Sequence, residues 1–335
     1  MTVFVIAEAG VNHNGDIKLA KQLIAIAAEA GCNAVKFQTF SAHQLVIKNV
    51  EKAGYQEAND GTGSQLEMLK RLQLSEADHD ILKETCCEYG IEFLSTGFGV
   101  AEIKYLIKLG VRRLKIPSGE LTNLPLLQEA ASAGLPILLS TGMADLAEVQ
   151  ASLQALINAG CTRDRITILH CTSLYPAPVE TVNLKAMQTM RDAFGVAVGY
   201  SDHTLGDEIT IAAVALGATV IEKHFTISRT LPGPDHRASL EPYELRNLVQ
   251  SIRIVESSLG NGEKRPNLYE QQTRLVARRS IVAARTIRRG DIFTTDNITC
   301  KRPGTGMSPM LWNDLIGISS SGNYRIDDLI DEVVP

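Results

Sequence analysis

The feature that most constrains this chain is a series of eight short apolar runs, each of which ends in polar residues. A buried strand needs only bulky side chains along its body, and Val, Ile and Leu supply them here. The polar groups at the end of each run serve no packing purpose, so the pattern indicates a fold in which eight strand ends meet. The runs cover residues 3–10, 33–40, 91–98, 113–120, 136–143, 166–173, 196–203 and 220–225.

Amphipathic helical patterns separate these runs, and most of them end at a glycine. Residues 16–31, for example, place four apolar side chains on one stripe before Gly31, a residue type that often terminates helices. The sequence strand, loop, helix, glycine occurs eight times in about 260 residues, which is typical of a (β/α)8 TIM barrel. A doubly wound open sheet is the rival α/β fold, but no GxGxxG motif opens the first helix. We therefore predict a TIM barrel over residues 1–260.

The pattern changes after the barrel. Residues 261–275 are polar and are predicted to form a linker, and residues 276–335 are predicted to form a small second domain. Short β-branched runs at 280–283 and 291–294 alternate there with turn signals. Because about 60 residues are marginal for independent stability, we expect this domain to dock onto another surface.

Composition narrows the class of partner. The formal net charge of −5 is mild and there is no Lys/Arg block, which argues against nucleic acid. No apolar stretch approaches the length of a membrane span, and the N-terminus has no charged region typical of a signal peptide. The six cysteines lack CxxC spacing and are predicted to be reduced, mostly buried thiols. These features predict a cytoplasmic protein without membrane contact.

Two histidines, His203 and His224, close consecutive predicted strands. In a parallel barrel their imidazoles would lie side by side at the barrel mouth. Two neutral imidazoles suit a divalent metal such as Mn²⁺, Fe²⁺, Co²⁺ or Zn²⁺, and they leave coordination positions open for substrate and water. A pair of hydrogen-bonded histidines without a metal is the alternative interpretation.

Two lysines, Lys36 and Lys115, lie inside apolar strand sequence. A lysine rarely tolerates burial without an anionic partner. That partner is either a nearby carboxylate, such as Glu8 or Glu120, or a phosphate or carboxylate ligand. Hydroxyl groups at matching strand ends would complete an anion pocket with the two ammonium groups. They belong to Ser118, Ser140, Ser173 and Ser201.

Glu8 and Glu120 are the candidate acid/base groups, and neutralising the lysines is their alternative role. Two further segments would lie over this site. The loop 231–239 carries Asp235 between stiffening Pro and Gly residues, and it is interpreted either as a closing loop or as a simple turn. The long polar, Gly-rich segment 44–66 is predicted to be a substrate lid.

Several motifs together resemble the sialic acid synthase family: AEAGVNHNGD, VKFQTF, LKIPSGELTNLP, LSTGMA, GYSDHTLG, EKHFT with PGPDH, and KRPGTGMSP. The likeness spans essentially the whole chain. It implies condensation of phosphoenolpyruvate with an N-acetylated mannose-type sugar, which gives a nine-carbon nonulosonic acid and phosphate. It also implies a divalent metal, Mn²⁺ or Mg²⁺, and an antifreeze-like (SAF) C-terminal domain. In such a family member, this domain is swapped across a homodimer and reaches over the partner's barrel.

The resemblance also implies roles for individual residues. The metal ligands would be His203 and His224. The phosphoenolpyruvate pocket would comprise Lys36, Lys115, Ser118, Ser140, Ser201 and, where some members have Asn, Ser173. The sugar site would comprise Glu8, Gln38, Tyr175, Asp235 and the partner subunit's Arg302. The catalytic groups would be Glu8, Glu120, Lys36 and Lys115.

The sequence leaves the sugar open. Members of the family use N-acetylmannosamine, a 2,4-diacetamido-2,4,6-trideoxymannose that gives legionaminic acid, or an altrose isomer that gives pseudaminic acid. Residues 52–72 resemble the bacterial neuraminate and legionaminate branches and do not separate these two. A non-catalytic carbohydrate-binding barrel is the alternative of another class. An enzyme for a phosphorylated aldose would need a second basic pocket, and no Arg cluster occurs at the predicted strand ends.

Overall fold

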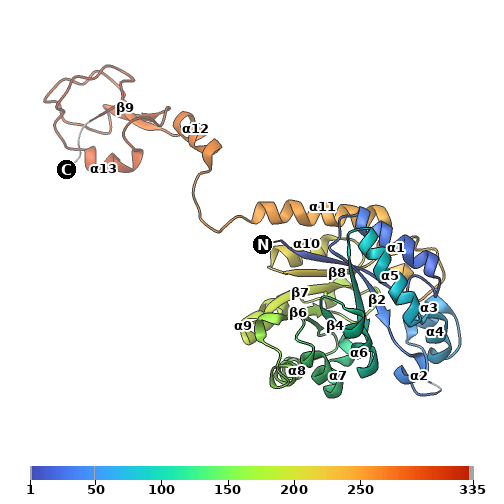
Figure 1. Cartoon of the computed structure of the whole chain (residues 1–335). Helices are drawn as coiled ribbons and strands as arrows, with labels where there is room; N and C mark the ends of the chain where they lie inside the picture. Colours follow the sequence, from blue (N-terminus) through green and yellow to red (C-terminus); the bar gives the residue numbers. More distant parts are fainter. Residues whose placement is uncertain (1, 49, 332–335) are drawn as a thin grey trace. The chain divides into compact units, whose positions relative to one another are not determined.

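The computed structural model describes residues 2–48 and 50–331, and the chain divides into two compact units, residues 1–260 and 261–335. In the first unit, eight parallel strands close into a barrel in chain order (Figure 1). The predicted TIM barrel is therefore confirmed. The strands are β1 (Phe4–Gly10), β2 (Ala34–Thr39), β3 (Glu92–Gly97), β4 (Leu114–Ile116), β5 (Ile137–Ser140), β6 (Ile166–Cys171), β7 (Ala197–Asp202) and β8 (Val220–His224).

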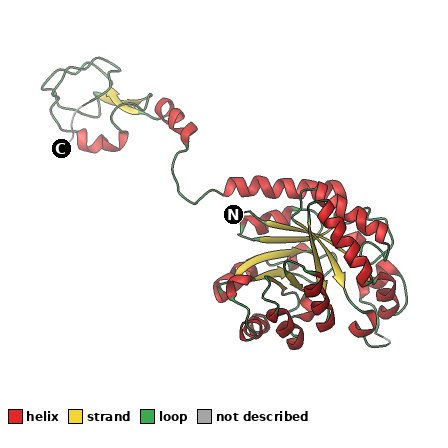
Figure 2. Ribbon diagram, viewed as in Figure 1, coloured by secondary structure: helices red, strands yellow, loops and turns green. Residues whose placement is uncertain are grey.

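Helices follow the strands and enclose them on the outside (Figure 2). Their boundaries follow from local chemistry: the Asp16 side chain accepts a hydrogen bond from the Lys18 amide at the start of the first helix, and Gly110 adopts left-handed backbone at the end of another. The main helices are α1 (Ile17–Glu29), α5 (Glu76–Glu88), α6 (Val100–Leu109), α7 (Leu124–Ser132), α8 (Leu146–Asn158), α9 (Lys185–Phe194), α10 (Glu208–Ala215) and α11 (Pro242–Leu259).

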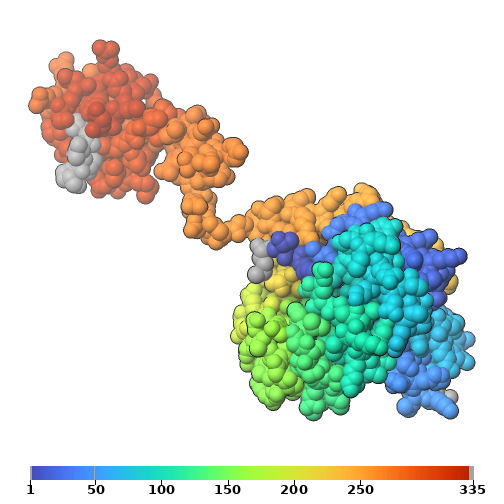
Figure 3. Space-filling view, in the orientation of Figure 1, coloured from blue at the N-terminus to red at the C-terminus, as the bar shows by residue number. Residues whose placement is uncertain are grey.

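The hydrophobic core of the barrel has two layers. The larger one lies between the strands and the surrounding helices, whose side chains cover the barrel on the face shown in Figure 3. The smaller one fills the interior of the barrel with Ile6, Ala34, Leu94, Leu138, Leu169 and Val220. Because the interior is packed with side chains, a ligand can bind only at one of the two ends of the barrel.

The segment 44–66, predicted as a lid, is partly helical. It includes the end of α2 (Ala42–Leu45), all of α3 (Gly54–Asp60) and the start of α4 (Gln65–Leu72). The Asp60 carboxylate holds the segment together, because Lys52 Nζ and Arg71 Nη2 each lie 2.7 Å from its Oδ2 atom. Asn59 Nδ2 donates to the carbonyl of Pro234, 2.8 Å away, and so ties this segment to the loop after β8.

The second unit has its own small core and two antiparallel strands, β9 (Ser280–Ala283) and β10 (Ile298–Lys301). The predicted strand at 280–283 is therefore confirmed. Residues 291–294 are not a strand: Ile292 forms only an isolated bridge, and Phe293 is buried in the core. The predicted linker is partly helical, because α12 (Leu268–Ala277) begins within it. A single further turn of helix, α13, covers Trp312–Leu315.

Two predictions from composition can be compared with the structure. All six cysteines are free, and four of them are buried, as expected for reduced thiols. In the part of the chain that the structure describes, no helix is both long enough and apolar enough to cross a bilayer. The cytoplasmic location stays a prediction.

Candidate active site

A cavity of about 520 Å³ opens at the C-terminal end of the barrel. The carboxyl ends of the strands converge there, so side chains that are distant in sequence share one space. All the predicted site residues except Arg302 line it: Glu8, Lys36, Gln38, Lys115, Ser118, Glu120, Ser140, Ser173, Tyr175, Ser201, His203, His224 and Asp235. Arg302 belongs to the second unit, where it is exposed and its Nε donates to the Ala277 carbonyl, 3.0 Å away.

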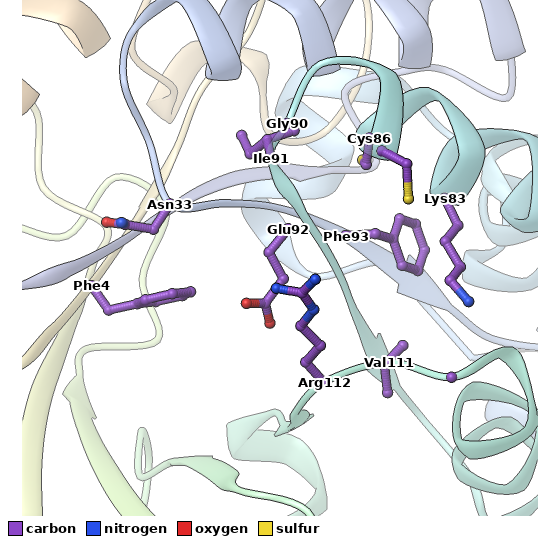
Figure 4. A pocket seen from close by; sticks show the side chains of 12 residues that line it. Phe4, Asn33, Lys83, Cys86, Gly90, Ile91, Glu92, Phe93, Val111 and Arg112 are labelled. Carbon is purple, nitrogen blue, oxygen red and sulfur yellow. The ribbon is translucent and has the colours of Figure 1, made fainter.

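Another cavity, of about 690 Å³, opens at the opposite end of the barrel, where the strands begin (Figure 4). Phe4, Asn33 and Glu92 line it from the starts of β1, β2 and β3, and Lys83 lines it from α5. None of the predicted site residues belongs to its described lining. In TIM barrels this end usually serves stability rather than chemistry.

Two ammonium groups and two carboxylates meet at the floor of the first cavity. Lys36 Nζ lies 2.7 Å from Glu8 Oε2 and 3.6 Å from Glu222 Oε2. Lys115 Nζ lies 3.7 Å from Glu222 Oε1. All four side chains are buried. The predicted neutralising role is thus shared between Glu8 and Glu222, whereas Glu120 Oε2 accepts a hydrogen bond from the Asn123 side chain instead.

The surroundings separate the protonation states of the two carboxyl groups. Burial raises the pKa of Glu8 to about 7, although the Lys36 charge opposes this shift. Burial would also raise the pKa of Glu222, but the charges of Lys115 and Lys36 outweigh it and hold this pKa at about 2. Near neutral pH, Glu222 is therefore ionised and Glu8 retains a proton part of the time. Burial lowers the pKa of Lys115, while the charges of Glu222 and Glu8 raise that of Lys36. When both lysines are protonated, the cavity floor carries net positive charge and suits an anion.

Hydroxyl groups extend this anion-binding surface. The Gly142 amide donates to Ser118 Oγ at 2.9 Å, and the Ser118 hydroxyl also lies 3.2 Å from the Cys171 thiol. Ser140 Oγ is buried and has no hydrogen-bond partner among the described residues. A buried hydroxyl without a partner is unfavourable unless a ligand completes it. The arrangement therefore provides hydrogen-bond donors around the two ammonium groups.

The two histidines present neutral imidazoles. Their ring centroids lie 5.5 Å apart, and burial lowers the pKa of both rings, that of His224 far below its usual value. His203 Nδ1 donates to the carbonyl of Thr172 at 2.6 Å, which leaves the lone pair on Nε2. His224 Nδ1 is buried and has no hydrogen-bond partner in the described ranges. The neutral nitrogen atoms of these two rings are suitable ligands for a divalent cation.

Such a cation would need further ligands. Among residues 2–48 and 50–331, no three His, Cys, Asp or Glu side chains form a group that could hold a metal ion. Two imidazoles alone leave most coordination positions to oxygen atoms from substrate or water, which is usual for a catalytic rather than a structural site.

Aromatic, acidic and apolar side chains line the rest of the cavity. The ring centroid of Tyr175 lies 4.2 Å from that of His203 and 5.1 Å from that of Tyr55 of α3, on which it stacks. Asp235 is buried nearby, and burial raises its pKa to about 6. The cavity also has an apolar wall, formed by α2, α4 and the residues that follow β1 and β3. The wall, as the name is used below, comprises Val11, Leu45, Met68, Leu69, Leu72 and Phe98.

Relatives identify the family. Residues 23–264 match the NeuB family model, and residues 278–323 match the SAF domain. The chain belongs to the NeuB family. This chain is 53% identical over 326 residues to the N,N'-diacetyllegionaminic acid synthase of Legionella pneumophila, covering 96% of this chain and 92% of that protein.

Other NeuB family relatives agree. The N,N'-diacetyllegionaminic acid synthase of Campylobacter jejuni is 48% identical over 331 residues, covering 98% of each chain. The crystal structure of an N-acetylneuraminic acid synthetase from Leptospira borgpetersenii aligns with a TM-score of 0.73 at 37% identity, and covers 82% of this chain and 90% of that one. The resemblance to sialic acid synthases and the SAF domain are therefore confirmed.

Sequence reasoning missed three residues of this NeuB site. Glu222 was missed although it lies two positions before His224, on the same face of β8, and alternation along the strand could have found it. Thr96 accepts a hydrogen bond from Lys36 Nζ at 2.8 Å, but its side chain resembles any core threonine in sequence. Tyr55 is brought in by the fold of the lid, for which the sequence held no signal.

Proposed function

We propose that this protein condenses phosphoenolpyruvate with an N-acylated mannose-type aldose to give a nonulosonic acid and phosphate, with the help of a divalent cation. The observation that carries the proposal is the convergence of two buried lysines, serine hydroxyl groups and two neutral imidazoles around one cavity. A barrel that only binds carbohydrate would not need this buried positive charge, which is unfavourable without an anion.

Phosphoenolpyruvate supplies two anionic groups, and the floor of the cavity supplies their partners. Lys36 and Lys115 would hold the phosphate and the carboxylate, and the hydroxyls of Ser118, Ser140 and Ser201 would complete the hydrogen bonds. As the enol carbon attacks the aldehyde, positive charge develops at the carbon that bears the phosphate. The substrate's own carboxylate and phosphate, together with the Glu222 carboxylate, would offset this positive charge. The ammonium and hydroxyl groups would hold the two substrate anions in place and stabilise the phosphate as it leaves, without reorganisation.

His203 and His224 would hold the cation, which is proposed to be Mn²⁺ or Mg²⁺ on the basis of the family resemblance. When bound, it supplies polarisation of the aldehyde carbonyl and a template that keeps both reactants in register. The tautomer of His203 set by Thr172 and the unpartnered nitrogen of His224 support this assignment.

Proton transfer falls to the carboxyl groups. Attack on the aldehyde leaves an alkoxide that must take up a proton, and Glu8, with a pKa of about 7, is the carboxyl able to give one near neutral pH. Water then adds at the carbon that bears the phosphate, and phosphate leaves as that carbon becomes the keto group. Glu120, at the cavity edge, would accept the proton of this water.

The preferred sugar is proposed to be 2,4-diacetamido-2,4,6-trideoxymannose rather than N-acetylmannosamine. A 6-deoxy sugar ends in a methyl group, which gains from burial against an apolar surface, whereas the 6-hydroxyl of N-acetylmannosamine loses hydrogen bonds there. The apolar wall supports this choice, and the names of two relatives agree with it.

Phosphate release tests both parts of the proposal. Purified full-length protein with Mn²⁺ should release phosphate from phosphoenolpyruvate only when sugar is present, and chelation should stop it. With the two sugars side by side, kcat/KM should favour the diacetamido sugar by about tenfold or more, as one buried methyl and one amide pocket allow. No sugar-dependent release would indicate the carbohydrate-binding alternative, and equal rates would overturn the choice of sugar.

The homodimer is proposed from the family resemblance, with the partner subunit's Arg302 completing each cavity. Mixing two inactive variants tests it. A dimer of Arg302→Ala with Lys115→Met would contain one complete site only if the arginine acts across the interface. Random mixing should then restore about a quarter of the wild-type activity, since half the dimers are mixed and each has one intact site. No recovery would show that each chain completes its own cavity.

A further inference from the structure

Each of the two candidate metal ligands, His203 and His224, directly follows a charged residue whose side chain points away from the cavity. Side chains alternate along a strand, so Asp202 and Lys223 face outward where His203 and His224 face the cavity. Asp202 and Lys223 are direct neighbours in the register of β7 and β8, and Lys223 Nζ lies 2.7 Å from Asp202 Oδ2. Both residues are only 1% exposed.

The Asp202 carboxylate is surrounded by donors. Its Oδ2 atom accepts from Lys223 and, at 2.5 Å, from the hydroxyl of Thr210 on α10. Its Oδ1 atom accepts from the amide and the hydroxyl of Thr204, each at 2.8 Å, and from the Tyr200 hydroxyl at 3.3 Å. The carboxylate therefore fastens the chain on both sides of His203, at residues 202 and 204.

Lys223 fastens the same junction from the other strand. Besides Asp202, its ammonium group donates to the Thr204 carbonyl at 2.7 Å. The backbone on either side of His203 is thus attached to the residue that precedes His224. A sliding of β7 against β8, or a rotation of the turn after β7, would break these bonds before it could change the separation of the two imidazoles.

We propose that the Asp202–Lys223 pair is a positioning device that sets the separation of His203 and His224 and thereby the affinity of the site for a divalent cation. This inference rests on the proposed function, in which those histidines hold the cation. Fold stability alone gives little reason for such a pair, because apolar residues of similar volume are often as stable as a buried ion pair. Outer contacts that orient metal ligands commonly change metal affinity about 10- to 100-fold.

The test measures Mn²⁺ binding directly, without substrates. Full-length protein is titrated with Mn²⁺, and free Mn²⁺ is followed by its electron paramagnetic resonance signal. Asp202→Asn and Lys223→Met should each raise the Kd about 10- to 100-fold. Thr210→Val removes only one donor to Asp202 and should raise it less. If Asp202→Asn does not fold, the Thr210 and Lys223 variants still decide the question.

Ser152→Ala is the matched control. The Ser152 hydroxyl is also buried, and it donates to the Leu121 and Glu148 carbonyls, but it lies on α8, away from β7 and β8. This variant should lower the melting temperature and leave the Kd for Mn²⁺ unchanged. If the Asp202, Lys223 and Thr210 variants behave in the same way, the pair is structural and the inference is overturned.

Failure of the proposed metal site would give a different result. His224→Ala should abolish high-affinity Mn²⁺ binding. If it binds Mn²⁺ as the wild type does, the histidines are not the ligands, and both the metal assignment and this inference fall. If His224→Ala loses binding while Asp202→Asn keeps the wild-type Kd, only the inference falls.

Discussion

The two ends of the barrel carry cavities of similar size and opposite character. At the end where the strands begin, two charged lining residues have partners in the protein: the Glu92 carboxylate lies 2.7 and 3.0 Å from Arg113 Nε and Nη2, and Lys83 donates to the Leu109 carbonyl. At the other end, the partners that the described residues offer Lys115 are weaker: a carboxylate oxygen of Glu222 at 3.7 Å and the Ile116 carbonyl at 3.5 Å.

The two cavities differ in how their polar groups are bonded rather than in how much space they enclose. The larger cavity, of about 690 Å³, is at the end without the predicted site residues, so volume is a poor guide. The smaller cavity holds buried polar groups whose bonding capacity the protein does not fill, such as the hydroxyl of Ser140. Folding alone would not retain such groups, because burying them without partners is unfavourable.

Removing one lysine from each cavity should give the largest contrast. Lys115→Met deletes a buried ammonium group that has poor partners in the protein, and we expect kcat/KM to fall about 10³-fold. Lys83→Met removes a half-buried ammonium group at the other end, and activity should stay within about twofold of the wild type. Phosphate release under saturating sugar measures both. Equal losses in the two variants would show that the C-terminal cavity has no special role.

A methyl group added at Gly142 should have the next largest effect, because Gly142 lies beside Ser118 and Ser173, called the serine cluster here. A Cβ atom at Gly142 would lie 2.2 Å from Ser173 Oγ and 2.9 Å from Ser118 Oγ, so both hydroxyls must move. We expect Gly142→Ala to raise the KM for phosphoenolpyruvate about 10- to 100-fold, with a smaller change in kcat.

Gly54→Ala provides the control, because a Cβ there meets no atom of the described residues within 4 Å, and Gly54 is not among the described residues that line the cavity. It should leave both constants unchanged. If Gly142→Ala binds phosphoenolpyruvate as the wild type does, the serine cluster lies outside the anion pocket.

The regular part of the fold could be predicted because it is encoded locally. Apolar runs and glycine-terminated helices repeat eight times, and the strands and helices lie close to those predictions. The lid could not, because its conformation depends on tertiary partners: Asp60 binds Lys52 and Arg71, and Asn59 binds the loop at Pro234. The same holds for Phe293. Its neighbours in sequence favour a strand, but it lies in an irregular segment that is held in place by packing in the core of the second unit.

The candidate site could be predicted where a polar residue interrupts an apolar strand, as for Lys36 and Lys115. Glu222 was not predicted, because in sequence it lies next to Lys223 and the two resemble a neighbouring charge pair. In the structure they face opposite sides of β8 and bind different partners. Which carboxyl group neutralises which lysine is a matter of distance across the barrel, and distance is not encoded in spacing along the chain. The roles of the site residues stay predictions until they are tested by substitution.

Replacing one carboxyl group at each end of the barrel by an amide should give the smallest effect. The two substitutions should change the free energy of unfolding in opposite directions. Burial raises the folded-state pKa of Asp235 to about 6 from the usual 3.8, so ionising it opposes folding, by at most about 3 kcal/mol above pH 6. Asp235→Asn should therefore raise the free energy of unfolding of metal-free protein at pH 8 by about 1 to 3 kcal/mol. This gain should shrink as the pH falls through 6 and vanish near pH 4, where wild-type Asp235 is protonated.

Glu92→Gln, which weakens the ion pair with Arg113, should instead lower the free energy of unfolding at pH 8. Urea unfolding at several pH values measures both variants, and a loss of stability in Asp235→Asn at pH 8 would show that its carboxylate has a cationic partner in the folded protein.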